Sequence, residues 1–421
     1  TTLFRSTGRK QMKRIIVAGG GAAGFMSAFH AKRPDTEVTV LEAQEKPGKK
    51  LLATGNGKCN LTYASREPLL SYRGTGQDFT EAALQTFDQE RTVQFFEELG
   101  MLMHEKNGGV YPYTDQAQTV QTLFLDVLRE RGVKIKTRER IIDILPQKKG
   151  GFFVKTEGWQ YEADVVILAC GSKAAQTLGG CEDGYHLAEK LGHPVTEIVP
   201  ALVPLKTKEA AFHALAGLRS PAKVRLFLDG KKAAESEGEL QWTSYGISGI
   251  VVFQVSRFAA LGLLEKKNVQ ISLNLLPQVN RQHLLAIYQK QINKKAEHLL
   301  SGIFPQKLAA LLLKQTGYKA GEILQEESFL EILSLVSDLR LTVTGTRSFE
   351  YAQVCAGGID TAFVNAKTME SKKVPGLYFA GEILDVDGAC GGYNLQWAWS
   401  SGYLAGYHAA NDQKGQVEQN A

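Results

Sequence analysis

RIIVAGGGAAGFMSAFHAKRPDTEVTVLE, the stretch from Arg14 to Glu42, decides the fold of this chain. It begins with Ile15–Ala18, a short apolar run rich in β-branched residues, which is typical of a strand buried on both faces. Gly19, Gly21 and Gly24 follow at the spacing G-x-G-x-x-G. A buried strand followed by glycines at this spacing indicates a tight turn into a helix, the arrangement with which many α/β proteins bind phosphates.

The rest of the stretch completes a dinucleotide-binding unit. In such a turn the first glycine permits the change of direction, the second lets a pyrophosphate approach the backbone, and the third lets the helix pack close to the strand. We expect the helix over roughly 22–32, with its free N–H groups and positive dipole end at the phosphates. Val38–Leu41 reads as a second strand, and Glu42 ends it 18 positions after Gly24, where a carboxylate accepts hydrogen bonds from ribose hydroxyls. Together these features predict a Rossmann unit, and a glycine turn that binds nothing is the alternative.

The composition is that of a globular protein with more than one domain. The 421 residues exceed a single ordinary domain, and the 43% hydrophobic and 22% charged fractions are usual for folded proteins. No apolar run approaches the roughly 18 residues of a membrane span and no signal peptide is visible, so we expect no membrane partner. Residues 1–11 read as a vector remnant, because Met12 and the residues after it look like a natural start directly before the first strand.

The cysteines favour a reducing compartment. The chain has five of them, scattered widely and odd in number: Cys59, Cys170, Cys181, Cys355 and Cys390. They form no C-x-x-C pair, so neither a zinc site nor a vicinal redox disulfide is indicated, and we expect no metal. A cytoplasmic location is the simplest interpretation.

The positive charge is concentrated in the middle of the chain. The net charge is +5, and residues 196–344 hold 18 Lys and Arg against 13 Asp and Glu, whereas the remainder is balanced at 31 of each. Within this part, 277–321 carries seven basic residues and one acid. Such a segment suits an RNA partner, but a solvated helix face has the same composition, and both interpretations stay open.

A second glycine-rich loop follows the Rossmann unit in KPGKKLLATGNGKCNLT, from Lys46 to Thr62. The run Gly55-Asn56-Gly57 permits close backbone approach to a flat ring or a phosphate. Asn56 and Asn60 add amide donors and acceptors. A polar surface loop of the same composition is the alternative.

The middle of the chain changes character twice. Three prolines between 194 and 204 mark a plausible domain boundary. Strands at 224–228, 239–242 and 269–275 predict a small antiparallel barrel or sandwich. Residues 278–338 then show helical periodicity, which predicts a helical subdomain inserted in the β one.

Two later segments return to the Rossmann sheet. ADVVILACG, residues 163–171, reads as a buried strand, and GLYFAGE, residues 376–382, as a strand that runs into a turn. CGGYNLQWAWSSG, from Cys390, then opens a helix whose N-terminal dipole suits a ring that collects negative charge. An ordinary terminal helix is the alternative. Gly179–Gly184 has no strand before it, so we expect no second Rossmann unit and no separate NAD(P)H domain.

The motifs at the two ends of the chain, taken together, resemble those of a known family. The motifs that carry the resemblance are GGGAAG, LEAQEKPGKKLLATGNGKCNLT, YPYTDQA, GELQWTSYGISG, KTMESKKVPGLYFAGEILDVDG and CGGYNLQWAWSSG. They are similar to those of the three-domain bacterial flavoproteins of the BaiN/RdsA type, also called NAD(P)/FAD-dependent oxidoreductases, from Met12 to about Gly406. The chain departs from many relatives at GNGKC, where they have GGGRC, and at Cys390, where they often have Thr.

The resemblance implies an α/β fold, with a Rossmann-type FAD-binding domain of the two-dinucleotide-binding-domain flavoprotein type. A β-barrel domain and a helical subdomain are inserted in it. The implied boundaries are 12–195 with 345–421 for the FAD-binding domain, 196–276 with 339–344 for the barrel, and 277–338 for the helical subdomain. The residues implied to hold FAD are Gly19, Gly21, Ala23, Gly24, Glu42, Lys50, Asn56, Gly57, Cys59, Ile141, Glu382, Asp385, Asn394, Leu395 and Gln396.

The resemblance leaves several activities open. Members resemble reductases of conjugated C=C bonds, including steroid dienones, enzymes that convert a uridine of 23S ribosomal RNA to dihydrouridine, and aminoacetone oxidases. We expect reduction of a C=C bond of a small molecule or ribosomal RNA, with NAD(P)H as a transient electron donor. Oxidation of a small amine by O2 is the alternative, and an RNA-binding protein with structural FAD is a further one.

Reduction of a C=C bond needs a proton donor near the flavin. The candidates are Cys59, Tyr111, Tyr113 and Tyr245. Tyr111 and Tyr113 also suit packing or gating, which is the commoner use of a tyrosine pair.

Overall fold

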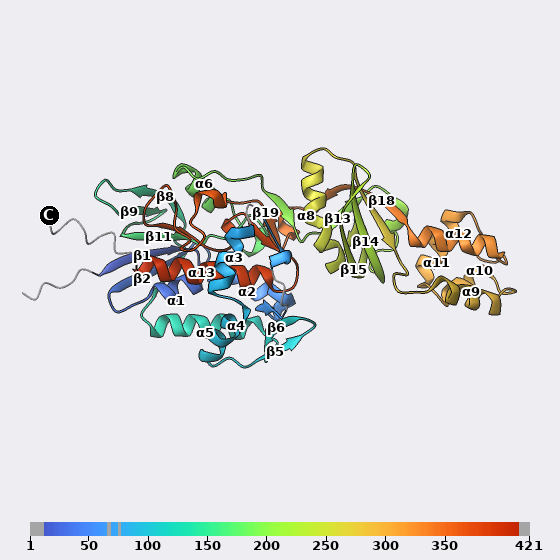
Figure 1. Cartoon of the computed structure of the whole chain (residues 1–421), viewed down its shortest axis with the longest axis horizontal. Coiled ribbons are helices and arrows are strands. Elements are labelled where there is room, and N and C mark those ends of the chain that lie inside the picture. The colour runs from blue at the N-terminus through green and yellow to red at the C-terminus, as the bar shows by residue number, and fades with distance from the viewer. Residues whose placement is uncertain (1–11, 65–68, 75–76, 412–421) are drawn as a thin grey trace, which may run out of the picture. The chain divides into compact units, whose positions relative to one another are not determined.

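The computed structural model describes residues 12–64, 69–74 and 77–411. The expected vector remnant, residues 1–11, lies outside the described residues. The chain forms two compact units, which are Thr1–Ile198 with Val354–Ala421, and Val199–Gln353. Their helices and strands are labelled in Figure 1. The segment 345–353, which the sequence assigned to the first domain, belongs to the second unit, and the finer separation of a helical subdomain stays a prediction.

The first unit is built on a five-stranded parallel sheet with the order β20-β11-β1-β2-β7 (Figure 1). The strands are β1 (Lys13–Ala18), β2 (Thr36–Glu42), β7 (Lys134–Thr137), β11 (Val165–Leu168) and β20 (Leu377–Phe379). β1 lies at the centre, with β2 on one side and β11 on the other. The chain therefore folds back on its N-terminal strand from more than 100 residues away, and the carboxyl ends of these strands meet at one edge of the sheet. The predicted Rossmann fold is confirmed.

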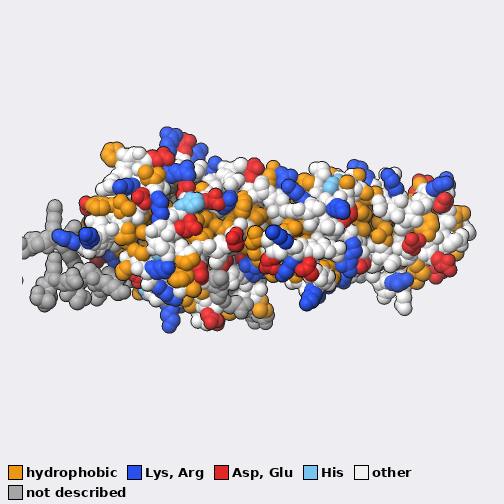
Figure 2. Space-filling view, turned by 90° about the horizontal axis from the view of Figure 1, so that it is seen from above, with side chains coloured by type: hydrophobic (Ala, Val, Ile, Leu, Met, Phe, Trp, Pro, Cys, Tyr) orange, Lys and Arg blue, Asp and Glu red, His pale blue; other side chains and the backbone are white. Residues whose placement is uncertain are grey.

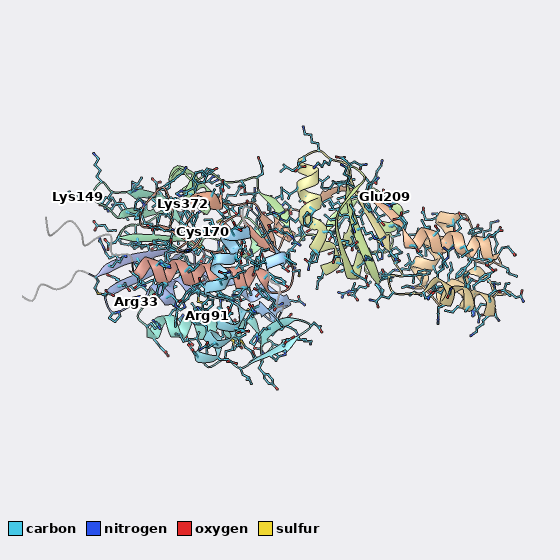
Figure 3. The ribbon with its side chains drawn as sticks, in the orientation of Figure 1. Arg33, Arg91, Lys149, Cys170, Glu209 and Lys372 are labelled. Carbon is cyan, nitrogen blue, oxygen red and sulfur yellow. The ribbon has the colours of Figure 1, made fainter. Side chains whose placement is uncertain are left out.

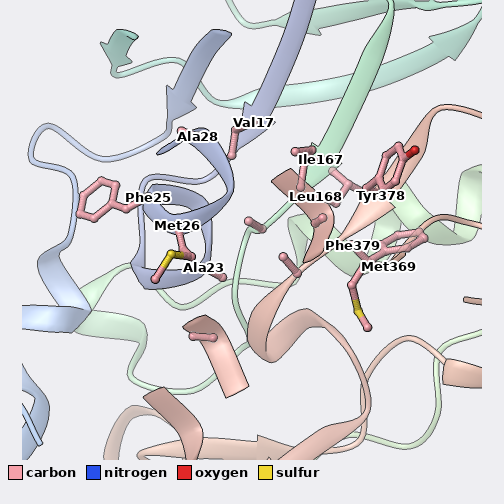
Figure 4. Packing of buried hydrophobic residues seen from close by; sticks show 14 of the residues in the cluster. Val17, Ala23, Phe25, Met26, Ala28, Ile167, Leu168, Met369, Tyr378 and Phe379 are labelled. Carbon is pink, nitrogen blue, oxygen red and sulfur yellow. The ribbon is translucent and has the colours of Figure 1, made fainter. Parts of the chain in front are cut away.

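The sheet is covered by α1 (Ala22–Ala31) and α13 (Tyr393–Asn411), which pack closely against each other. Close packing depends on two glycines of α13. A Cβ at Gly402 would lie 2.6 Å from the carbonyl oxygen of Ala23, and a Cβ at Gly406 would lie 2.2 Å from that of Ser27. Figure 4 shows the apolar side chains that α1 and the strands contribute to this core.

The remaining elements of the first unit surround this core. Its other helices are α2 (Lys49–Ala53), α3 (Gln77–Thr86), α4 (Gln89–Glu98), α5 (Ala117–Glu130) and α6 (Asp183–Lys190), with 3₁₀ turns η1 (Thr54–Gly57), η2 (Leu69–Ser71), η3 (Gln176–Leu178), η5 (Thr361–Phe363) and η6 (Gly381–Ile383). Its other strands are β3 (Thr62–Tyr63), β4 (Tyr72–Gly74), β5 (Met103–Lys106), β6 (Gly109–Pro112), β8 (Ile141–Pro146), β9 (Phe152–Thr156), β10 (Gln160–Ala163), β19 (Val354–Ala356) and β21 (Val386–Gly388). They form the small sheets β3-β6-β5, β10-β9-β8 and β21-β4, among others.

The second unit contains a closed antiparallel barrel with the order β13-β16-β15-β14-β17-β18. The barrel strands are β13 (Leu205–Thr207), β14 (Arg219–Leu228), β15 (Lys231–Thr243), β16 (Gly246–Ser248), β17 (Val269–Asn274) and β18 (Leu339–Thr346). The unit also contains β12 (Val199–Ala201), which is not part of the barrel. Its helices are α7 (Ala210–His213), α8 (Ile250–Leu264), α9 (Arg281–Lys290), α10 (Ala296–Ser301), α11 (Gln306–Thr316) and α12 (Glu326–Ser337), with the 3₁₀ turn η4 (Phe349–Tyr351).

Two features of the barrel differ from the prediction. The hairpin β14–β15 is longer than the predicted strands 224–228 and 239–242, because its charged residues occupy exposed positions that apolar periodicity does not register. Helix α8 was not expected, since it is apolar over most of its circumference and shows little helical periodicity. The predicted succession of a β-barrel and a helical region is confirmed.

Among the described residues, no helix has both the length and the apolar character needed to cross a bilayer. On the face seen in Figure 2, charged side chains of both signs are interspersed with apolar ones.

Candidate functional site

The turn between β1 and α1 has the geometry of a phosphate cradle. Gly19 has φ +106°, and a Cβ there would lie 2.4 Å from the carbonyl oxygen of Ala169. A Cβ at Gly24 would lie 1.9 Å from the carbonyl oxygen of Gly19, so this position also excludes a side chain. Gly21 is different, because a Cβ there would meet no atom within 4 Å and would point into open space.

The N-terminus of α1 is free to receive an anion. Gly21 is its N-cap residue, no side chain caps the first turn, and that turn contains no acidic residue. Its first N–H groups and its positive dipole end therefore face the open space beside Gly21. Ala23, also predicted here, packs against the turn η6, since a Cβ at Gly381 would lie 2.7 Å from the Ala23 Cβ. This is the arrangement that a pyrophosphate requires.

Glu42 lies beside the cradle at the end of β2. One carboxylate oxygen accepts a hydrogen bond from the Gly20 N–H at 2.8 Å, and the other accepts one from the Gln44 N–H at 2.7 Å. Burial raises the pKa of Glu42, and the two backbone N–H groups oppose that rise. The carbonyl oxygen of Glu42 accepts a hydrogen bond from the Glu139 N–H, which brings the segment before Ile141 next to this acid. Glu42 and the segment that leads to Ile141 thus lie near one another, as expected if both contact the nucleoside of the cofactor.

The second predicted loop forms η1 and exposes its backbone. Gly55 and Asn56 both have left-handed conformations, with φ of 56° and 57°, and Gly57 has φ +85°. A Cβ at Gly57 would meet nothing within 4 Å, so this backbone is open to a flat ring. Asn tolerates the left-handed region better than other residues with a Cβ, which explains its place between two glycines.

An ion pair joins three segments that are distant in the sequence. Lys50 of α2 pairs with Glu382 of η6 at 2.5 Å, and the Ser172 hydroxyl donates to the same carboxylate oxygen of Glu382 at 3.0 Å. Ser172 comes four residues after the end of β11, and Cys170, labelled in Figure 3, is partly buried in the same connection. The sequence identified Lys50 and Glu382 but missed Ser172. Its position just after a strand of the parallel sheet was the available signal.

The remaining predicted residues lie at the start of α13 and, in the case of Asp385, just before β21. The Asn394 side chain accepts a hydrogen bond from the Gly388 N–H at 2.8 Å and donates to the Gly388 carbonyl oxygen at 2.9 Å, which fixes the end of β21 to this helix. Leu395 is partly buried. Asp385 is buried, and its carboxylate accepts a hydrogen bond from the Thr196 hydroxyl at 3.2 Å.

The Gln396 side chain points into the core. Its side-chain oxygen accepts hydrogen bonds from the hydroxyls of Thr62 and Thr92, at 2.6 and 2.9 Å. Its amide nitrogen donates to the Phe87 carbonyl oxygen and to the Ser400 hydroxyl, and the whole residue is buried. Because these four bonds use both the carbonyl oxygen and the two N–H groups, the side chain of Gln396 has a structural role, and the predicted cofactor contact of this residue stays a prediction for its backbone.

The predicted proton donors lie in different environments. Cys59 is fully buried, and burial raises the pKa of its thiol to about 12, so its side chain is not exposed to a ligand in this structure. Tyr113 is 66% exposed. Tyr245 belongs to the second unit. Tyr111 lies on β6, and its ring would be 3.5 Å from a Cβ at Gly55, so it faces the exposed loop.

The structure adds an acidic residue and its partners, which the sequence analysis missed. Asp115 accepts a hydrogen bond from Lys58 at 2.7 Å with one carboxylate oxygen, and its other oxygen lies 3.0 Å from His104 Nε2. Hydrogen bonds from Lys58 and His104 lower the pKa of Asp115. His104 is the cross-strand neighbour of Tyr111. We call these four residues, Lys58, His104, Tyr111 and Asp115, the Asp115 cluster.

Tyr111 is the member of the Asp115 cluster that is available to a ligand. Its hydroxyl forms no hydrogen bond within the described ranges of the chain. Burial raises the pKa of Tyr111 and nearby Cys390 adds to the effect, so the hydroxyl stays protonated at neutral pH. Asp115 itself has φ 53°, a conformation that is costly for a residue with a Cβ and is often found at functional sites.

These features together fit FAD. The cradle that a Gly21 side chain would fill suits a pyrophosphate, Glu42 suits a ribose, and the open η1 backbone with the start of α13 suits a flat ring. Among the residues that the structure describes, no group of His, Cys, Asp and Glu is arranged to hold a metal ion.

Comparisons with known proteins agree with this description. Residues 13–408 match the family described as HI0933-like protein Rossmann domain. The chain is 42% identical over 409 residues to a 3-dehydro-bile acid delta(4,6)-reductase of Clostridium scindens, which covers 95% of this chain and 99% of that protein. It is 30% identical over 394 residues to a ribosomal RNA dihydrouridine synthase of Escherichia coli, which covers 92% and 96%. Among solved structures, a 3-ketosteroid delta1-dehydrogenase from Sterolibacterium denitrificans has a TM-score of 0.51 at 12% identity over 94% of this chain and 99% of that one, a similarity of fold alone.

Proposed function

Since this chain belongs to the HI0933-like family of Rossmann-domain proteins, we propose that it is an FAD-dependent oxidoreductase that reduces a conjugated C=C bond of a small molecule. The observation that carries the substrate class is the 42% identity, over nearly the full length of both proteins, to a reductase named for a 3-dehydro bile acid. A relative of this similarity and coverage supports a shared type of reaction.

The residues that would hold FAD lie along the carboxyl edge of the sheet. The cradle and the N-terminus of α1 would bind the pyrophosphate, and Glu42 would bind the ribose. The pair Lys50–Glu382 would orient the ribityl chain that links the pyrophosphate to the ring. FAD, when bound, supplies the two-electron transfer, with NAD(P)H as the source of electrons.

Reduction of a C=C bond adds a hydride to one carbon and a proton to the other. We assign the proton to the Tyr111 hydroxyl, because this group has no protein partner in the described chain and faces the exposed η1 loop. Asp115 and its partners would position Tyr111, since Lys58 follows the exposed loop and His104 is the cross-strand neighbour of Tyr111. Asp115 thereby ties the loop to the hairpin β5–β6.

A second candidate substrate is ribosomal RNA. The seven basic residues between Pro277 and Gly321 are all exposed, and none forms an ion pair within the part of the chain that the structure describes. Unpaired surface lysines and arginines suit a phosphate backbone. A relative named for dihydrouridine synthesis in ribosomal RNA supports the same substrate.

The test is anaerobic reduction and reoxidation of the flavin. Purified holoenzyme is mixed with NADPH or NADH, the loss of flavin absorbance is recorded, and a 3-oxo steroid with conjugated double bonds is added. We expect the nicotinamide to bleach the flavin and the steroid to restore its colour. Bleaching by aminoacetone but by neither nicotinamide, with reoxidation by O2 alone, would contradict the proposal in favour of an amine oxidase. A saturated 3-oxo steroid is the control, because it has no double bond to reduce.

A further inference from the structure

One polar side chain beside the open loop η1 has no partner in the protein. Asn60 follows the end of η1 by three residues, and its Oδ1 is buried without a hydrogen-bond partner. Its Nδ2 forms no hydrogen bond with any residue that the structure describes. The residue as a whole is partly exposed. Asn60 therefore carries an acceptor and a donor that the fold itself leaves unused.

Two glycines enclose the carboxamide of Asn60. The Cβ position at Gly109 on β6 lies 2.7 Å from both Oδ1 and Nδ2 and 2.9 Å from Cγ, so one face of the carboxamide lies flat against this glycine. The Cβ position at Gly392, directly before α13, lies 3.0 Å from Oδ1. A side chain at either glycine would displace the carboxamide. The protein thus leaves room for this polar group without binding it.

The backbone that leads to Asn60 is strained. Cys59 has φ 60°, a conformation that is costly for a residue with a Cβ and is often found at functional sites. The Cβ position at Gly55 in η1 lies 2.7 Å from the backbone nitrogen of Asn60 and 3.5 Å from a ring carbon of Tyr111. Asn60 therefore lies where η1, the strand β6 and the start of α13 meet. The strands and helices that flank this point, α2, β6 and α13, are labelled in Figure 1.

An unpartnered carboxamide is unfavourable in the flavin-free protein. Burial of a hydrogen-bonding group without a partner costs free energy, whereas burial of an apolar group of the same shape does not. Packing alone would therefore favour leucine over asparagine here, because the two side chains have nearly the same shape. A ligand with a complementary polar edge would remove this cost, and it would explain why the polar residue is present.

The pyrimidine edge of a flavin ring is complementary to a carboxamide. This edge has one N–H donor, at N3, which lies between the carbonyl acceptors at C2 and C4. A carboxamide has one acceptor and one donor side by side, and rotation about its Cβ–Cγ bond presents either atom to the open side. The dimethylbenzene edge at the other end of the ring has no hydrogen-bonding group. A carboxamide in the site would therefore distinguish the two ends of the ring.

We propose that the Asn60 carboxamide binds the N3–H and carbonyl edge of the flavin and so orients the ring. The proposal deepens the proposed function, because it specifies how the FAD which that function requires is held. The residues that it involves all belong to the first compact unit. The uracil of an RNA has the same N–H and carbonyl edge, and the experiment separates these two sources.

The experiment is titration of the flavin-free, full-length protein with FAD and with FAD methylated at N3, followed by fluorescence quenching. The variants are Asn60→Ala and Asn60→Leu. The matched control is Asn107→Gly, which removes an exposed asparagine from the turn between β5 and β6, where φ is 51° and suits glycine. We expect the parent to bind the methylated flavin about 10- to 100-fold more weakly than FAD. Asn60→Ala should bind the two flavins nearly equally, and Asn107→Gly should keep the preference of the parent.

Thermal melts of the flavin-free proteins separate binding from folding. Asn60→Leu should weaken binding of FAD about 10-fold or more, because a donor and an acceptor are lost. The thermal midpoint of its flavin-free form should stay at or above that of the parent, because the unpaired carboxamide is gone. A lower midpoint together with an unchanged affinity for FAD would make Asn60 a structural residue and refute the proposal.

The remaining outcomes separate this proposal from the proposed function. If the parent binds FAD but Asn60→Ala keeps the parent's preference between the two flavins, the Asn60 contact is refuted while the FAD-dependent reductase stands. If the parent binds no FAD, the proposed function and the contact both fail. Uridine monophosphate is added to holoenzyme as a third probe. Binding of this nucleotide by the parent that is lost in Asn60→Ala would assign the residue to a uracil substrate and overturn the flavin contact.

Discussion

Gly21 offers the sharpest test of the cofactor site, because the structure separates its effect on folding from its effect on binding. A Cβ at this position meets no atom within 4 Å, and the backbone, with φ −97° and ψ −169°, lies in the extended region that valine prefers. The substitution Gly21→Val therefore costs the fold only the difference between glycine and valine at an N-cap, about 1 kcal/mol or less. In a unit of this size that corresponds to a fall in Tm of about 2–4 °C.

The effect on FAD should be much larger. The valine methyl groups would occupy the space that the pyrophosphate needs beside the free N–H groups of α1. Loss of two hydrogen bonds to a charged group, at about 1.5–3 kcal/mol each, raises Kd for FAD about 10²- to 10⁴-fold. The assay is titration of the flavin-free protein with FAD, followed by the quenching of FAD fluorescence, beside a thermal melt of the flavin-free form.

Two controls make this result decisive. Gly158 lies between β9 and β10, also has no atom within 4 Å of its Cβ position and has no left-handed backbone, so Gly158→Val should leave FAD affinity unchanged. Gly24→Ala should instead destabilise the protein itself, because its Cβ would lie 1.9 Å from a carbonyl oxygen. Parent-like FAD affinity in Gly21→Val would refute the placement of the phosphates.

Three further substitutions test other parts of the site. Glu42→Ala should cost about 1–3 kcal/mol of FAD affinity through the lost ribose contact, and an unchanged Kd would show that another group binds the ribose. Tyr111→Phe should slow reoxidation of reduced flavin by the conjugated substrate about 10²- to 10⁴-fold without slowing reduction by NADPH, and equal losses in both steps would exclude a proton donor. Charge reversal at Lys290, Lys294 and Lys295 should weaken binding of a 23S fragment and lower its salt dependence if RNA is the substrate; parent-like binding by this triple variant would exclude the RNA hypothesis.

The sequence by itself determined the Rossmann unit, the family and the succession of barrel and helices. The predictions of family and fold class are confirmed by the family match and by the sheet. These features are readable because their signals are local. A run of apolar residues, glycines at fixed spacing and an acid 18 positions later are properties of neighbouring residues, and each has one physical reason.

Tertiary structure decided which side chains meet and which way they face. Lys58, His104 and Asp115 are separated by up to 57 residues, and only the pairing of β5 with β6 and the fold of the loop bring them together. Gln396 follows Leu395 at the start of α13, yet its side chain points into the core. The helix rotates successive residues by about 100°, and on the inner side the hydroxyls of Thr62 and Thr92 donate hydrogen bonds to Gln396. Arg347 lies over the ring of Tyr245, which is distant in the sequence, because β18 and the turn between β15 and β16 both lie beside β13. Local patterns specify elements, whereas the partners of a side chain depend on contacts between segments that are distant in the sequence.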